Sequence, residues 1–218
     1  MLQRYRLVVF DWEGTLAESG LGYVLNAVEL AAERLHLGQI DGHIAREAVP
    51  LGLANAIKKL FPTASLHQQE DILVEAQKAL SALATKTQMV PGAEDTVRFL
   101  AQEGMSLAIA TNRSAQGLLR ALQSSGLDTF FQITRSATEA PSKPCPQMLE
   151  EIMDVLQMDA TQTLMVGDSI SDIEMASAIG VDAVGMDFFH VEEQSLRAAG
   201  ACEVFDDYQA LQQYIKDN

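Results

Sequence analysis

The chain has 218 residues, enough to bury a substantial core as one domain or as one domain with a smaller insertion. Its 30 acidic residues outnumber 15 basic ones, and the formal net charge of −15 argues against nucleic acid or an anionic membrane surface as a partner. Two cysteines are too few for a disulfide framework or a zinc site. No apolar run approaches the roughly 18 residues of a membrane span. We therefore expect a cytoplasmic, globular protein.

The first predicted element is a buried strand at residues 7–10, formed by the apolar run Leu-Val-Val-Phe. Asp11 follows it directly, and Gly14 permits a sharp turn. In open parallel α/β sheets, ligands bind just outside the carboxyl ends of the strands, so a carboxylate placed there faces a ligand crevice. An acid after a strand is also common as a helix cap or turn residue. Taken alone, this stretch leaves both interpretations open.

Residues 17–88 contain helical patterns and no convincing strand. Apolar residues at three- and four-residue spacings predict a helix over 21–37, and further helices are predicted over 41–48, 53–61 and 65–85. Basic residues in this segment are candidate contacts for an anionic ligand, although a solvated helix charge is the simpler interpretation of each: Arg46, Lys58 and Lys59. We expect an all-helical insertion here.

From residue 89 onward, predicted helices and strands alternate. Strands are expected at 106–110, 130–133, 163–166 and 182–184, and helices at 93–103, 114–125, 146–157, 171–179 and from 208. This alternation predicts right-handed crossovers and a parallel sheet with helices on both faces. The sequence therefore predicts an α/β core formed by residues 1–16 and 89–218, with the helical segment 17–88 inserted into it.

Further polar residues follow the later predicted strands. Thr111 and Asn112 come after the strand at 106–110, Lys143 precedes Pro144 in a loop, and Asp168 follows the strand at 163–166 with Asp172 four residues on. Each has an ordinary structural explanation: a helix cap for the threonine and asparagine, a solvated loop lysine, and an N-terminal helix charge for Asp172. Their order along one chain favours a shared functional site.

In that order, these residues resemble the four motifs of the haloacid dehalogenase-like (HAD) superfamily, and most closely its phosphoglycolate phosphatase-like branch. The matching stretches are Asp11-Trp12-Glu13-Gly14-Thr15, Thr111-Asn112, Lys143-Pro144 and Gly167-Asp168-Ser169-Ile170-Ser171-Asp172. The resemblance spans nearly the whole chain. It implies a Rossmann-like core with an α-helical cap domain inserted after the first strand. It also implies a Mg²⁺-dependent phosphatase that hydrolyses a small phosphate ester, such as phosphoglycolate or a sugar phosphate.

The resemblance also implies a role for each matching residue. Asp11 is the expected nucleophile, and its attack on phosphorus gives an aspartyl-phosphate that divides the hydrolysis into two displacements. Mg²⁺ suits a site of carboxylates and carbonyls, and its implied ligands are Asp11, the main-chain carbonyl of Glu13 and Asp168, with Asp172 near them. The implied phosphate-binding residues are Thr111, Asn112 and Lys143.

Glu13 departs from the family pattern, which has an aspartate at this position as general acid and base. The extra methylene displaces the carboxyl by about 1.5 Å, and a misplacement of about 1 Å can cost about a hundredfold in rate. A backbone carbonyl at residue 13 would bind metal regardless of side-chain length. The departure motivates a second hypothesis: a catalytically impaired relative that binds a phosphate ligand or a protein partner through the same pocket.

Overall fold

The computed structural model describes residues 4–38, 40, 44, 48, 52–83, 87–190 and 192–218. The chain divides into two compact units, one made of residues 1–17 and 89–218 and the other of residues 18–88. The larger unit is an α/β core and the smaller is helical. Most of the helix expected at 41–48 lies outside the described residues.

The α/β unit is built on a six-stranded parallel sheet with the strand order β3-β2-β1-β4-β5-β6. The strands are β1 (Leu7–Phe10), β2 (Ser106–Thr111), β3 (Ile133–Ser136), β4 (Thr163–Gly167), β5 (Asp182–Met186) and β6 (Glu203–Phe205). The chain runs outward from β1 through β2 to β3, then returns to the other side of β1 to form β4. This reversal of direction is the topological switch point at which open α/β sheets bind ligands. The predicted α/β fold class is confirmed.

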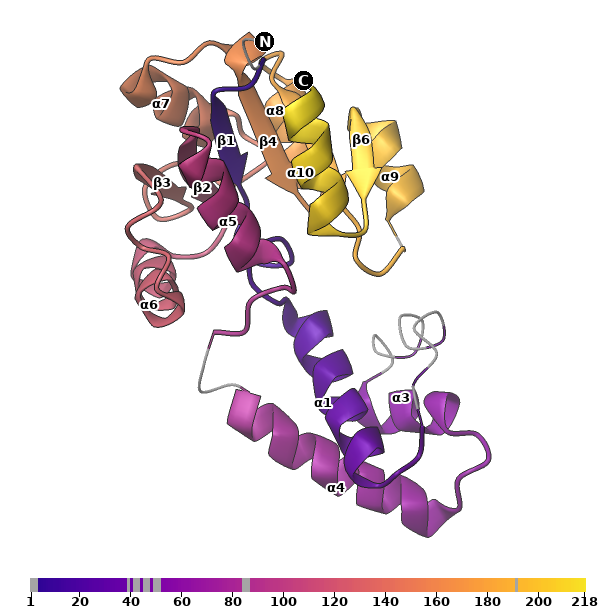
Figure 1. Cartoon of the computed structure of the whole chain (residues 1–218). Helices are drawn as coiled ribbons and strands as arrows, with labels where there is room; N and C mark the ends of the chain where they lie inside the picture. Colours follow the sequence, from indigo (N-terminus) through magenta and orange to yellow (C-terminus); the bar gives the residue numbers. More distant parts are fainter. Residues whose placement is uncertain are drawn as a thin grey trace. The chain divides into compact units, whose positions relative to one another are not determined.

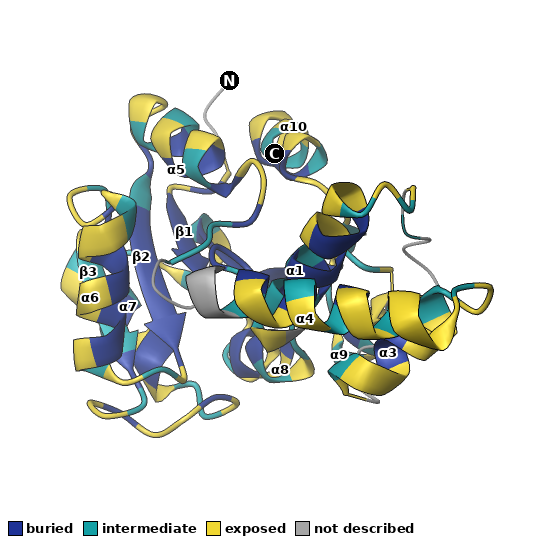
Figure 2. Cartoon of the chain, turned by 90° about the horizontal axis from the view of Figure 1, so that it is seen from below, coloured by how far each residue is buried: buried dark blue, intermediate teal, exposed yellow. Residues whose placement is uncertain are grey.

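Helices cover both faces of the sheet (Figure 1). Alternate β1 residues point to opposite faces, as the two-residue period of a strand requires: Val8 and Phe10 join one core cluster, and Leu7 and Val9 join the other. The first cluster includes residues of α5 (Ala93–Gln102), α6 (Ala115–Ser125) and α10 (Tyr208–Asp217), and the second includes residues of α7 (Gln147–Leu156), α8 (Ile170–Ser177) and α9 (Glu193–Ala199). The central strands are therefore buried on both sides, and Figure 2 shows β1 and most of β2 in the colour of buried residues.

The helical unit has a small core of its own. Its helices are α1 (Gly20–Arg34), α3 (Leu53–Leu60) and α4 (Leu66–Leu83). Buried apolar side chains from all three helices meet in one cluster: Val28, Ala31, Ile57, Ile72 and Ala76. This cluster explains how the segment packs as a separate unit. In the part of the chain that the structure describes, no helix is long and apolar enough to cross a membrane.

The strand predicted at 130–133 is wrong in its position. The residues before Ile133 form a turn in which the Phe130 N–H donates to the Leu127 carbonyl at 3.1 Å, and Phe131 is buried in the first core cluster. The two aromatic residues therefore anchor the chain between α6 and β3 to the core, and β3 begins only at Ile133. Three short elements were not predicted: a 3₁₀ helix at Ala160–Gln162, α9 and the edge strand β6.

Candidate active site

Residues predicted from separate motifs meet at the carboxyl ends of the central strands β1 and β4. Asp11 follows β1, Asp168 follows β4, and Asp172 lies in the first turn of α8. One carboxylate oxygen from each of these three aspartates lies within 4.8 Å of the other two. The topology thus produces a cluster of three carboxylates from stretches more than 150 residues apart in the chain.

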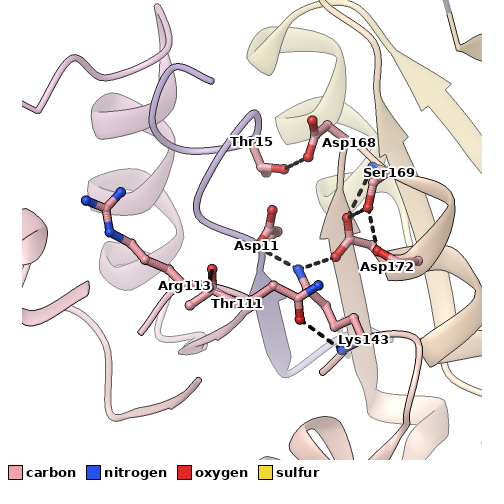
Figure 3. A network of polar contacts seen from close by, with 10 residues as sticks. Asp11, Thr15, Thr111, Arg113, Lys143, Asp168, Ser169 and Asp172 are labelled. Atoms are coloured by element: carbon pink, nitrogen blue, oxygen red, sulfur yellow. Dashed lines mark hydrogen bonds and ion pairs between the residues drawn. The ribbon is translucent and has the colours of Figure 1, made fainter. Parts of the chain in front are cut away.

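Lys143 connects two members of this cluster. Its Nζ donates to Asp11 Oδ1 and to Asp172 Oδ1, both at 2.6 Å (Figure 3). All three side chains are buried, with the Lys143 side chain 3% exposed. A buried charge needs a partner of opposite sign and further hydrogen bonds. The solvated-lysine interpretation is therefore wrong, and Lys143 is part of the site.

Hydrogen bonds from neighbouring residues fix the orientation of this group. Ser169 Oγ and the Ser169 N–H donate to Asp172 Oδ2 at 2.7 and 3.1 Å, which closes a capping box at the start of α8. The Lys143 N–H donates to Asn112 Oδ1 at 2.9 Å. Asn112 therefore ties the lysine loop to the end of β2. Both oxygens of Asp172 are occupied by these contacts, which makes Asp172 a helix cap and an anchor for Lys143 at once.

Two glycines allow the aspartates to approach. Gly14 has a φ of +87°, a left-handed conformation that favours glycine, and a Cβ there would collide with the Asp168 carboxylate. At Gly167, a Cβ would collide with the Asp172 side chain. Two hydrogen bonds to residues distant in sequence also stabilise the turn after β1. Tyr208 Oη donates to the Thr15 carbonyl at 2.6 Å, and Thr15 Oγ1 donates to Asp168 Oδ1 at 3.3 Å.

Burial and mutual repulsion raise the pKa values of two of these carboxyls, Asp11 and Asp168. Burial, together with the Asp172 charge, raises the pKa of Asp11 to about 6 although Lys143 opposes the rise. Burial and the charges of Asp11 and Asp172 raise the pKa of Asp168 to about 7. For Lys143, burial acts to lower the pKa, but the Asp11 and Asp172 carboxylates outweigh it and the pKa is raised. The single positive charge of Lys143 therefore does not balance the negative charge of the three carboxylates.

A divalent cation fits this set of donors. The site offers buried carboxylate oxygens, which hard cations such as Mg²⁺ prefer, and it lacks compensating positive charge. Since Lys143 already holds Asp11 Oδ1 and both Asp172 oxygens accept hydrogen bonds, the oxygens with most capacity for a metal are Asp11 Oδ2 and those of Asp168.

The remaining predicted residues lie at the edge of the cluster. Thr111 is buried at the end of β2, where its Oγ1 accepts from the Arg113 N–H at 3.2 Å. The Glu13 side chain is 55% exposed and does not join the three carboxylates; its Oε1 accepts from Arg113 Nη1 at 2.6 Å. Among the predicted site residues of the four matching motifs, the structure therefore brings all together except the side chain of Glu13.

Three residues in the site had no predicted role. Ser169 could have been found, since a serine three residues before an aspartate at a helix start is a capping-box pattern. Arg113 and Tyr208 gave no local signal, because their contacts span 100 and 193 residues of sequence. In the helical unit, Lys58 lines a hollow of about 230 Å³ between α3 and α4, together with Ala54, Ile57, Leu66, Gln69, Glu70 and Leu73. Arg46 lies outside the described residues.

The chain is similar to known proteins over most of its length. Residues 8–186 match the haloacid dehalogenase-like hydrolase family. The phosphoglycolate phosphatase of Rhodospirillum rubrum is 31% identical over 222 residues, which cover 96% of this chain and 90% of that protein. The phosphoglycolate phosphatase of Pseudomonas putida is 31% identical over 217 residues, covering 94% and 78%. A crystal structure of a HAD-superfamily hydrolase from Geobacter sulfurreducens superposes with a TM-score of 0.61 at 20% identity and covers 98% of both chains, a likeness of fold. The chain belongs to the haloacid dehalogenase-like hydrolases, as a phosphatase of that family.

Proposed function

We propose that the chain is a Mg²⁺-dependent phosphomonoesterase that hydrolyses a small organic phosphate, phosphoglycolate-like or sugar-phosphate-like, through an aspartyl-phosphate intermediate. The observation that carries the proposal is the buried group in which Lys143 holds one oxygen of Asp11 while Asp168 lies beside it. The names of the curated relatives support the choice of phosphoglycolate as the first substrate to test. A cytoplasmic location is part of the proposal, in keeping with cysteines that form no disulfide.

The proposed reaction begins with attack by Asp11. Lys143 donates to Asp11 Oδ1, and its charge offsets the negative charge that develops as an Asp11 carboxylate oxygen attacks phosphorus. The ester P–O bond breaks as the Asp11 O–P bond forms, and the leaving oxygen takes a proton from Glu13. Glu13 then accepts a proton from the water that hydrolyses the aspartyl-phosphate. Mg²⁺, when bound by Asp11, Asp168 and the Glu13 carbonyl, would neutralise phosphate charge.

Thr111 and Asn112 have supporting roles in this proposal. Thr111 lies where β2 ends, one of the strand ends that face the crevice, and its hydroxyl would donate to a phosphate oxygen. Asn112 holds the Lys143 loop through the bond to the Lys143 N–H. The helical unit is proposed as a specificity cap, with Lys58 as a candidate anion contact.

A second candidate function is binding without efficient turnover, and the observation that favours it is the position of Glu13 outside the carboxylate cluster. Release of inorganic phosphate from a panel of monoesters, with Mg²⁺ and with EDTA, separates the two. We expect Mg²⁺-dependent release from at least one small ester. Binding of a panel member without phosphate release would favour the second candidate.

A further inference from the structure

We infer that Arg113 is a positioning residue that restrains Glu13 at the edge of the site and so limits protonation of the leaving group. The inference rests on the proposed function. Its basis is the ion pair from Arg113 Nη1 to Glu13 Oε1 at 2.6 Å, which joins the turn after β1 to the turn after β2. In Figure 3 the Arg113 guanidinium points away from Asp11 and Lys143. The carboxylate that it holds is 55% exposed and lies outside the cluster around the nucleophile.

Side-chain length makes this pair specific to a glutamate. Removal of one methylene would withdraw the carboxyl by about 1.5 Å, and a contact of 2.6 Å would lengthen to about 4 Å, beyond hydrogen-bonding distance. An aspartate at position 13 would therefore be released from Arg113, whereas the glutamate reaches it. The extra methylene has a structural consequence as well as a possible catalytic one: it gives the acid a competing partner.

The restraint acts on one step of the proposed reaction. As the Asp11 O–P bond forms and the ester P–O bond breaks, a proton moves from the Glu13 carboxyl to the leaving oxygen, and Glu13 is left as a carboxylate. For that transfer the Glu13 carboxyl must leave Arg113 and come within hydrogen-bond reach of the ester oxygen. An ester whose leaving group departs as a stable anion needs no such proton. The two kinds of ester therefore report separately on nucleophilic attack and on acid assistance.

The test compares kcat/KM for 2-hydroxyethyl phosphate, a poor leaving group, with kcat/KM for p-nitrophenyl phosphate, which leaves as the phenolate. Because kcat/KM reports only on steps up to release of the alcohol, hydrolysis of the aspartyl-phosphate does not enter. The ratio of the two constants is also independent of how much of a preparation is folded. Neither substrate has a second anionic group that Arg113 could bind.

We expect Arg113→Gln to raise the alkyl-to-aryl ratio by about two- to fivefold, the effect on an equilibrium that an exposed ion pair commonly has. Arg113→Lys, which keeps the charge, should move the ratio less than Arg113→Gln does. In a Glu13→Asp background, where the pair cannot form, Arg113→Gln should leave the ratio unchanged. The matched control is Arg197→Gln, which removes another partly exposed arginine of an ion pair, at the β6 edge of the sheet, and should also leave it unchanged.

Four results would overturn the inference. An unchanged ratio in Arg113→Gln, with both esters hydrolysed, would remove it and leave the proposed function standing. The same rise in the Glu13→Asp background would mean that Arg113 does not act through Glu13. With phosphoglycolate as a third substrate, a fall in kcat/KM confined to it, with no change in the alkyl-to-aryl ratio, would assign Arg113 to binding of the substrate carboxylate. Failure to hydrolyse any ester of the panel, these two included, would overturn the proposed function, and this inference with it.

Discussion

The free energy of unfolding of the metal-free protein should fall as the pH rises from about 5 to about 8, and Mg²⁺ should restore most of it. The reason is the charge balance of the site, where two buried carboxylates and one partly buried carboxylate lie close together with a single lysine. Most acid groups in proteins have pKa values at or below their ordinary ones and stabilise the fold as the pH rises. Asp11 and Asp168 do the opposite, since their pKa values are raised.

The sign and size follow from linkage. With a pKa of about 7 in the folded protein against an ordinary value of 3.8, Asp168 keeps its proton in the folded state at a pH where the unfolded chain has lost it. Unfolding then releases a proton, so raising the pH favours unfolding until the folded pKa is passed. Between about pH 5 and about pH 7 this costs about 3 kcal/mol, at about 1.4 kcal/mol per unit. Asp11, with a pKa of about 6, adds about 1 kcal/mol between about pH 5 and about pH 6.

Urea unfolding at several pH values measures the effect, because urea, unlike guanidinium chloride, adds no ionic strength. Stability in EDTA should fall by about 4 kcal/mol over this interval, and Mg²⁺ at about a hundred times its dissociation constant should return about 2.7 kcal/mol at the upper pH. Asp168→Asn should remove most of the pH dependence and most of the response to Mg²⁺. Asp128→Asn, at an exposed position in the same unit, is the control that should change neither.

If the free energy of unfolding in EDTA stays level or rises as the pH increases over this interval, the explanation from charge balance is refuted. An Asp168→Asn variant with the same pH dependence as the wild type would also refute it, because the carboxyl held responsible would then have no effect. Stabilisation by Mg²⁺ that is equal in the wild type and in Asp168→Asn would place the metal elsewhere.

Three further substitutions test individual contacts of the site. Asp11→Asn should abolish phosphate release and keep the near-ultraviolet circular dichroism of the wild type, and activity above a few per cent would exclude Asp11 as the nucleophile. Lys143→Met, which leaves Asp11 and Asp172 without their buried cation, should destabilise the metal-free protein by about 3–5 kcal/mol in urea unfolding and lower kcat/KM at least about a hundredfold. Tyr208→Phe should lower the free energy of unfolding by about 1–2 kcal/mol, because the hydrogen bond to the Thr15 carbonyl is lost, and it should weaken Mg²⁺ binding. Fluorescence of the single tryptophan, Trp12, measures the Mg²⁺ affinity, and an unchanged affinity would show that Tyr208 does not hold the metal-site turn.

The parts of the fold that the sequence predicts well are those whose pattern is local. Leu7–Phe10 is an unbroken apolar run, and the structure buries all four residues, because a central parallel strand is covered on both faces. The α/β class follows from the alternation of helices and strands after residue 89. The carboxyl-edge rule then predicts where Asp11 and Asp168 lie, since residues that follow neighbouring parallel strands reach the same edge of the sheet.

The parts that the sequence does not predict depend on distant partners or on weak local patterns. Phe130 and Phe131 have the aromatic composition of a strand, yet they serve as core contacts of a turn. β6 has three residues, all only partly buried, so its pattern is too short to recognise. The hydrogen bond from Tyr208 to the Thr15 carbonyl joins the last helix to the turn after β1, and no local sequence pattern predicts it.

In this site the conformation of the turn after β1 does not depend on the side chain of Glu13. The turn after β1 is set by the left-handed Gly14, by the bond from Tyr208 to the Thr15 carbonyl and by the close approach of Asp168. None of these contacts involves the side chain of residue 13. We therefore expect a glutamate in place of the family aspartate to leave the nucleophile, the lysine and the carboxylate cluster unaltered, and to change only the position of one acid and its ion-pair partner. A change in reaction rate without a change in the metal site is the consequence expected of such an arrangement.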